Sequence, residues 1–222
     1  VLDVGCGTGA LTRVLADLLG PHRVSAVDPS EAFVATCLSR VEGAEVVVAG
    51  AEALPFADGS FDAVLAQLVV NFVDDAPAAV LEMRRVARPG GVIAGCVWDY
   101  RAGMTLLRSF WDAAIDLGLP DAAERDQGRT MPYCTPSELV DLWRGAELDE
   151  VQTGEISADA EYASFDELWA PYDQGISSAG MYVTSLSASD RAALRAAMLA
   201  RIGSPYGQFK LSARGFWALG RR

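Results

Sequence analysis

The sequence predicts an α/β fold: a doubly wound sheet of seven strands, mostly parallel, with an antiparallel final strand and a helical insertion. Strand-like and helix-like segments alternate through the first hundred residues, which is typical of a parallel sheet covered by helices. An apolar run at 1–4 ends in the glycines Gly5, Gly7 and Gly9, and a last strand-like segment follows only after many helix signals. Together these observations indicate a Rossmann-like architecture.

The first five strands are expected at 1–4, 24–27, 45–49, 61–68 and 92–97. Helices are expected between them at 9–19, from Ser30 onward, and near 77–87. Gly20 and Pro21 end the first helix, and Ser30 has the residue type of an N-cap. The segment 88–91, Arg-Pro-Gly-Gly, predicts a tight turn that leads into the fifth strand.

Beyond Trp98 the alternation stops. Helices are expected at 105–117 and, after a capping box at 135–138, to near Gly145. The sixth and final strands are expected at 148–156 and 211–219. Between them, capping boxes at 164–167 and 187–190 predict a mostly helical segment. We therefore expect one domain over residues 1–222, with its core at 1–156 and 211–222 and a helical insertion or lid at 157–210.

Composition narrows the classes of function. The 222 residues are 51% hydrophobic, enough for one compact core, and the net charge of −12 comes from 18 basic and 30 acidic residues. No basic cluster exists, so we expect no nucleic-acid partner, and a neutral or cationic small molecule suits the charge better. The apolar stretch 64–73 is too short to span a bilayer, so no membrane span is expected.

Cysteine and histidine usage argues against several kinds of site. The four cysteines lie far apart without a C-x-x-C pair, and His22 is the single histidine, so we expect neither a metal site nor a Ser-His-Asp triad. Reduced cysteines predict a cytoplasmic protein, and the high Arg and Ala content is typical of a bacterial one. A homodimer stays open. Because the chain starts without Met inside a strand that should lie mid-sheet, we expect that an upstream segment is missing.

The glycine loop is the clearest functional signal. Glycines at this spacing let the backbone turn sharply out of a buried strand and approach a ligand, while the next helix offers free N–H groups. Asp28 ends the second strand about 20 residues later, as expected for a carboxylate that binds both ribose hydroxyls. Its alternative role is to cap the next helix. Gly5, Gly7 and Ala10 also match G-x-G-x-x-A, so an NAD(P)-dependent oxidoreductase is an alternative.

Four motifs occur in order along the first hundred residues: VLDVGCGTG, AVDPS, AEALPFADGSFDAV and RRVARPGGV. In this order they resemble the class I S-adenosylmethionine-dependent methyltransferases, and in particular the type-11 group that includes the ubiquinone and menaquinone C-methyltransferases. The resemblance covers Val1 to about Trp98. It implies S-adenosylmethionine as the cofactor and methyl transfer, by in-line displacement, to a small organic acceptor.

The resemblance also implies roles for residues of the glycine loop. Gly5, Cys6 and Gly7 would line the methionine part of the cofactor, with Asp3 bracing the loop. A carboxylate inside a strand covered on both faces is costly unless something satisfies it, which supports a functional role for Asp3.

Three later loops complete the implied cofactor site. Asp28 would hold the ribose, and Pro29 would pack near the adenine. Ala51 would present its backbone N–H to the adenine ring with Glu52 beside it, and Gln67 would face the amino acid end of the cofactor.

The sequence departs from the family in three places. Gly50 stands where relatives commonly have an Asp that contacts the adenine amino group, and Asn71 stands where they often have a His. The helical segment that usually precedes the first strand is absent. Gly50 and Asn71 motivate a second alternative, a non-catalytic cofactor-binding module.

Aromatic and polar residues predict where an acceptor would bind. The candidates near the expected pocket are Asn71, Trp98, Asp99, Tyr100, Trp169, Tyr172 and Tyr182. The aromatic residues of the insertion would form a lid over an apolar acceptor, or they would pack as the core of the insertion. No fixed catalytic residue is required, because a sulfonium leaving group is already activated. For hydride chemistry no Ser, Tyr and Lys constellation exists, since Lys210 is the only lysine.

Overall fold

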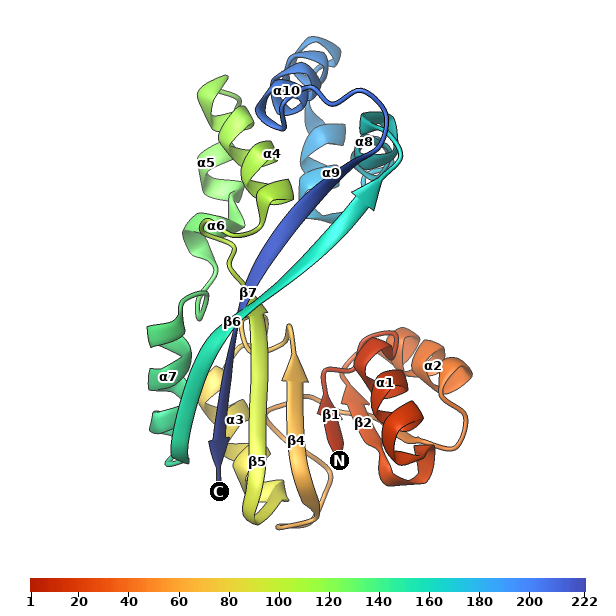
Figure 1. The fold of residues 1–222 in the computed structure, drawn as a ribbon, viewed down its shortest axis with the longest axis vertical. Helices are drawn as coiled ribbons and strands as arrows, with labels where there is room; N and C mark the ends of the chain where they lie inside the picture. The colour runs from red at the N-terminus through yellow and green to blue at the C-terminus, as the bar shows by residue number, and fades with distance from the viewer. The chain divides into compact units, whose positions relative to one another are not determined.

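The computed structural model describes residues 1–222, and its strands form one seven-stranded sheet in the order β3-β2-β1-β4-β5-β7-β6 (Figure 1). The strands are β1 (Leu2–Val4), β2 (Ser25–Asp28), β3 (Glu45–Val48), β4 (Phe61–Gln67), β5 (Ala87–Trp98), β6 (Asp149–Tyr162) and β7 (Phe209–Arg221). The first five pair in parallel, and β7 runs antiparallel to its neighbours. The predicted fold class is thus confirmed.

Helices connect the strands. They are α1 (Ala10–Leu19), the 3-10 helix η1 (Pro21–Arg23), α2 (Glu31–Arg40), α3 (Ala76–Val86), α4 (Thr105–Asp116), α5 (Ala122–Arg125), α6 (Gln127–Thr130), α7 (Pro136–Gly145), α8 (Phe165–Asp173), α9 (Ser177–Ser185) and α10 (Ala188–Arg201). Each predicted N-cap side chain accepts a backbone N–H of its helix: Ser30, Thr135, Ser164 and Ser187. None of these helices combines the length and apolarity needed to cross a membrane.

The chain divides into two compact units. The first comprises Val1–Val97, Pro132–Glu155 and Phe216–Arg222, and the second comprises Trp98–Met131 and Ile156–Gly215. The predicted insertion at 157–210 lies within the second unit, which also takes in α4, α5 and α6.

The predicted bounds of the last two strands, 148–156 and 211–219, are too short. Residues 157–162 continue β6: polar residues alternate there with Ala158, Ala160 and Tyr162, and all but Tyr162 are exposed. Side chains of β6 and β7 contact each other along this extension. Ser212 donates to Asp159 at 2.6 Å, and Tyr162 stacks on Phe209 with ring centroids 5.5 Å apart. The strand pair is therefore stabilised by contacts between segments distant in sequence.

The predicted tight turn at 88–91 lies inside β5. Phe61 of β4 pairs with Ala87, whereas Ala63 pairs with Val92, so the residues between them on β5 bulge out of the ladder. Gly90 has φ 75°, the left-handed conformation that a glycine adopts without strain. The turn-forming residues thus produce an irregularity within a strand rather than its start.

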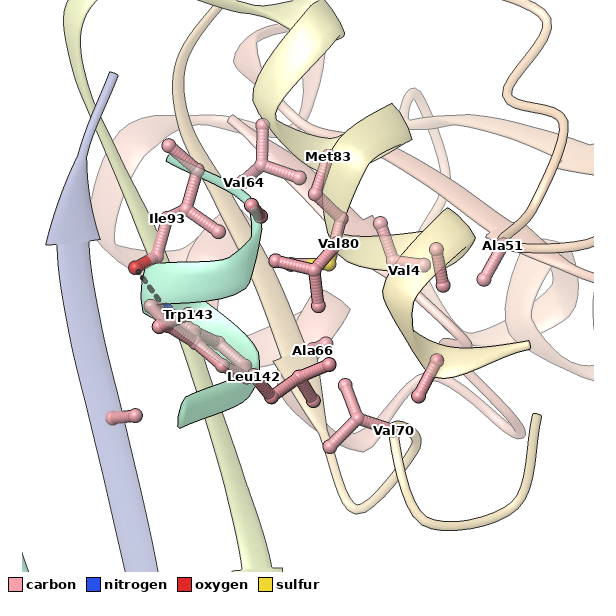
Figure 2. Packing of buried hydrophobic residues seen from close by; sticks show 14 of the residues in the cluster. Val4, Ala51, Val64, Ala66, Val70, Val80, Met83, Ile93, Leu142 and Trp143 are labelled. Carbon is pink, nitrogen blue, oxygen red and sulfur yellow. Dashed lines mark hydrogen bonds between the residues drawn. The ribbon is translucent and has the colours of Figure 1, made fainter. Parts of the chain in front are cut away.

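The core of the first unit joins the sheet to α3 and α7 (Figure 2). Val64 and Ile93 from the strands meet Val80 of α3 and Trp143 of α7, whose indole N–H donates to the Ile93 carbonyl at 3.1 Å. Leu65, the next residue of β4, packs instead in a second cluster with residues of α1. Because neighbouring strand residues point to opposite faces, α1 covers the face opposite to α3 and α7.

Trp143→Ala is expected to lower the free energy of unfolding by about 3–5 kcal/mol, because Trp143 is 0% exposed and its loss leaves a cavity and removes the hydrogen bond to the Ile93 carbonyl. Urea denaturation followed by circular dichroism measures this change. Leu18→Ala, at a residue 74% exposed on α1, should alter the same quantity by less than about 0.5 kcal/mol. Equal losses in the two variants would contradict the packing described.

Candidate functional site

One cavity of about 680 Å³ lies in the first unit, beyond the carboxyl ends of β1, β2 and β4. Its volume lies in the range of small-molecule sites, and its position is where open α/β sheets bind ligands. All nine residues for which the family resemblance implied cofactor contacts line it: Asp3, Gly5, Cys6, Gly7, Asp28, Pro29, Ala51, Glu52 and Gln67. The fold therefore brings four separate loops of the sequence to one cavity.

The glycine loop closes against the tip of β2. The N–H groups of Gly5 and Cys6 donate to the Val27 carbonyl at 2.8 and 2.9 Å. Gly5 has φ 71°, and a Cβ there would lie 2.4 Å from a methyl group of Val69, so only glycine allows this close approach. Gly7 also has positive φ, but a Cβ there would meet nothing within 4 Å. Gly5 thus serves packing, whereas Gly7 keeps space open.

Cys6 lies in the same loop and is buried. Burial, followed by the neighbouring Cys37 thiol, raises the pKa of the Cys6 thiol. It therefore stays protonated at neutral pH and is no nucleophile.

Asp28, at the end of β2, accepts hydrogen bonds from the glycine loop and from the residue before α2. Its Oδ2 accepts the Gly7 N–H and its Oδ1 accepts the Ser30 N–H, both at 2.9 Å. The second bond is local and is not the cap of the capping alternative, because the Ser30 hydroxyl itself caps α2 by accepting the Phe33 N–H. Each carboxylate oxygen has a further lone pair, so both remain able to accept a hydrogen bond from a ligand in the cavity.

Asp3 is a carboxylate buried in the wall of the cavity, with 1% exposure. Its Oδ2 accepts the Thr12 hydroxyl at 2.7 Å, while its Oδ1 has no hydrogen-bond partner. Burial raises the pKa of Asp3 to about 6, although the hydrogen bonds with Thr12 act in the opposite direction. A buried carboxylate with a free oxygen is costly, which indicates that a ligand group completes this site.

The end of β4 supplies the opposite wall. Leu68, directly after Gln67, has φ 62°, a conformation that costs energy in a residue with a side chain, and its N–H donates to the Cys96 carbonyl at 2.8 Å. Sequence reasoning missed several further lining residues: Thr8, Leu11, Phe33, Leu68, Val69, Phe72, Val73 and Asp74. Those at 68–74 lie in the loop from about Gln67 to Asp75, at the end of the predicted fourth strand, where a ligand is expected although only Gln67 and Asn71 have predicted roles.

None of the predicted acceptor contacts lines this cavity. Asn71 follows β4 but is 4% exposed, and neither polar atom of its amide has a partner. Trp98 and Tyr100 belong to the second unit, as does Asp99, whose carboxylate pairs with Arg214 at 2.6 Å. A role in binding an acceptor stays a prediction for all of them.

The aromatic residues of the insertion form a packed cluster in the second unit. Trp169 and Tyr172 are buried with Phe110, whose ring stacks on that of Tyr172 at 4.9 Å between centroids. Tyr182 packs in the same cluster and donates its hydroxyl to the Pro120 carbonyl at 2.8 Å. This packing corresponds to the alternative in which these residues are core, because amphipathic helices bury their aromatic faces against one another.

No group of three or more His, Cys, Asp or Glu side chains in residues 1–222 is arranged to hold a metal ion. The cavity is lined by carboxylates, hydroxyls, the Gln67 amide, backbone groups and apolar side chains.

The fold and this cavity have the arrangement of the class I methyltransferases of Rossmann-like fold. Residues 2–95, less than half of the chain, match the type-11 family described as "Methyltransferase domain". The match confirms the resemblance drawn from the four motifs and decides against the oxidoreductase alternative.

Two curated relatives and one solved structure illustrate the similarity. A malonyl-[acyl-carrier protein] O-methyltransferase of Pseudescherichia vulneris is 32% identical over 145 residues, covering 65% of this chain and 54% of its own length. A ubiquinone/menaquinone biosynthesis C-methyltransferase of Hahella chejuensis is 39% identical over 98 residues, with coverages of 41% and 39%. A Haemonchus contortus phosphoethanolamine N-methyltransferase in complex with S-adenosylhomocysteine has a TM-score of 0.59 at 16% identity, covering 99% of this chain and 48% of its own. The matched region spans about half or less of the length of these curated relatives.

Gly5→Ala is expected to lower the free energy of unfolding by about 2–4 kcal/mol, because the new methyl group clashes with Val69 and the backbone is left-handed. Gly7→Ala adds only the backbone strain, about 1 kcal/mol, since no atom lies nearby. Thermal and urea unfolding of both variants measure the difference. A Gly5→Ala protein as stable as Gly7→Ala would contradict the close approach to Val69.

Asp3→Asn is expected to stabilise the protein at pH 8 by about 1–3 kcal/mol. The folded-state pKa of about 6 lies above the unfolded value of 3.8, so the Asp3 carboxyl favours folding below about pH 4 and loses that contribution as pH rises through 6. The amide removes the buried charge and keeps an acceptor for Thr12. Urea unfolding at pH 4 and pH 8 should show a gain at pH 8 that vanishes at pH 4, and a pH-independent difference would contradict it.

Proposed function

We propose that this protein transfers the methyl group of S-adenosylmethionine to a small organic acceptor. One observation carries the proposal: four loops that match the family's cofactor motifs meet at a single cavity beyond the strand ends. The activity, the acceptor and the in-line displacement are proposed here for the whole protein.

The residues present are suited to the cofactor. Gly7 leaves open space where any side chain would fill the cradle, and Asp3 has an unpaired oxygen able to accept a bond from the cofactor's ammonium group. Asp28 retains lone pairs for the ribose hydroxyls, and Ala51 and Glu52 border the part of the cavity proposed for the adenine. Gly50 borders it too, so a side-chain contact to the adenine amino group is not available at that position.

S-adenosylmethionine, when bound, supplies a methyl group on a sulfonium sulfur, which leaves as a neutral thioether. The protein then has to align an acceptor with that methyl group and exclude water. Leu68, Val69, Phe72 and Val73 give the cavity an apolar wall that serves the second task. We assign no residue the role of general base.

The relatives' names cover chemically different acceptors, an acyl chain on a carrier protein and a quinone precursor. For this chain we propose a small-molecule acceptor. The cytoplasmic location and a homodimer remain predictions; none of the four cysteines forms a disulfide in the structure.

The proposal is tested by calorimetric titration with S-adenosylmethionine and S-adenosylhomocysteine. We expect saturable binding to the protein, and a loss of affinity of at least about tenfold in Gly7→Ala, because the new methyl group occupies the cradle. Transfer is then followed by mass spectrometry of an acceptor panel.

Gly118→Ala is the matched control for the titration. Gly118 follows α4 with φ 64°, near the 53° of Gly7, has nothing within 4 Å of a Cβ, and does not line the cavity, so the variant adds a methyl group at a similar positive φ. Its affinity should equal that of the unmodified protein. No binding by the unmodified protein at millimolar ligand would overturn the proposed function. Binding without transfer to any acceptor would favour the non-catalytic cofactor-binding module.

A further inference from the structure

The loop 49–60, between β3 and β4, brings Ala51 and Glu52 to the cavity but contains no helix or strand. An irregular segment lacks the repeating backbone hydrogen bonds of those elements, so its position depends on bonds to other parts of the chain. Its first residue is held by β2, since the Ala49 N–H donates to the Asp28 carbonyl at 3.1 Å. Further bonds come from α3.

Arg85 of α3 holds the loop and uses all five N–H groups of its guanidinium. Nη2 donates to the Leu54 carbonyl at 2.9 Å, and Nη1 donates to the Phe56 carbonyl and the Asp58 carboxylate, both at 2.8 Å. The remaining two bonds, at 2.7 and 2.8 Å, go to the carboxylate of Glu82. One side chain therefore fixes three residues of the loop.

Glu82 holds the same loop from the preceding turn of α3. It accepts the Leu54 N–H at 2.9 Å in addition to the two N–H groups of Arg85. Both backbone polar groups of Leu54 are thus bound to α3, the N–H by Glu82 and the carbonyl by Arg85. The hydrogen bonds from Arg85 hold the pKa of Glu82 below its ordinary value, so these bonds are made by a charged carboxylate at neutral pH.

The position of Ala51 depends on that of Leu54. Ala51 lies in the turn 50–53, directly before Leu54, and is buried in the same core as Met83 of α3 (Figure 2). A shift of Leu54 would therefore carry the Ala51 backbone with it. Gly50 offers no side chain to the base, so recognition of the adenine at this point depends on where the backbone lies.

We infer that Arg85 and Glu82 are positioning residues for the adenine of the cofactor, although neither lines the cavity. The inference rests on the proposed function and adds the residues that set the base-dependent part of the cofactor affinity. Arg85 acts through Leu54, which places Ala51. The planar guanidinium bridges several loop residues at once, and the single nitrogen of a lysine cannot reproduce that arrangement.

Two ligands separate positioning from a purely structural role. S-ribosylhomocysteine keeps the ribose and the amino acid of S-adenosylhomocysteine but lacks the adenine. If Arg85 only stabilised the fold, its substitution would change the affinities for both ligands alike or not at all. If it positions the loop, only the ligand that contains adenine is affected.

We expect Arg85→Gln to lower the affinity for S-adenosylhomocysteine by at least about fivefold in calorimetric titration, because several hydrogen bonds to the loop are lost. The affinity for S-ribosylhomocysteine, measured by competition against S-adenosylhomocysteine, should stay unchanged. Arg85→Lys should show the same selective loss. Glu82→Gln should show a smaller one, since its amide oxygen can still accept the Leu54 N–H, and it serves as the test variant if Arg85→Gln does not fold.

Arg84→Gln is the matched control. Arg84 precedes Arg85 on α3, its side chain is 34% exposed against 30% for Arg85, and it pairs with Glu147 at 3.4 Å. Its affinities for both ligands should equal those of the unmodified protein.

Hydrogen exchange of the ligand-free protein measures the restraint on the loop directly. Peptides that contain residues 50–58 should exchange at least about tenfold faster in Arg85→Gln than in the unmodified protein, because bonds that oppose local opening are lost. The same peptides should be unaffected in Arg84→Gln.

An equal loss of affinity for both ligands, no loss for S-adenosylhomocysteine, or unchanged exchange at 50–58 would overturn the inference. Binding of S-adenosylhomocysteine to the unmodified protein would still support the proposed function in each of those cases. If the unmodified protein does not bind S-adenosylhomocysteine, the proposed function fails and the inference fails with it.

Discussion

The two hydrogen bonds that Asp28 accepts from backbone N–H groups are the constraint on which the site depends. One fixes Gly7 of the loop after β1, and the other fixes Ser30 at the start of α2, each at 2.9 Å. A charged acceptor makes both bonds stronger than neutral ones would be. The carboxylate therefore holds the glycine loop after β1 against the end of β2, and Gly7 leaves open space where a Cβ would lie.

Asp3 shows the cost of this arrangement. Its burial disfavours the charged form, and only the Thr12 hydroxyl compensates one of its oxygens. The left-handed backbone at Leu68 is a second unfavourable feature on the opposite wall of the cavity. Such local costs are tolerated where the surrounding fold is stable, here through the core around Trp143 that joins α7 to the sheet. A bound ligand that donates a hydrogen bond to the Oδ1 atom of Asp3 would remove part of that cost.

The acidic lining and the position of the arginines act together. Ion pairs near the start of β4 hold basic side chains at one end of the sheet, and carboxylates line the other end without matching cations. This separation follows from where the strands begin and end, because parallel strands place all their carboxyl ends on one side. Two of these carboxylates, Asp3 and Asp28, are the groups proposed above to receive the cofactor's ammonium group and its ribose hydroxyls.

The sequence by itself determined the class of fold, the caps at Ser30, Thr135, Ser164 and Ser187, and the four loops that line the cavity, because apolar periodicity, capping residues and glycine spacing are local signals. Tertiary structure alone decided the rest. The extension of β6 to Tyr162 depends on partners in β7, and the burial of Trp169 and Tyr172 depends on Phe110 from a distant helix. The separate roles of Gly5 and Gly7 depend on Val69, which only folding brings beside one of them. These features come from contacts between residues far apart in the chain, and no local pattern encodes such contacts.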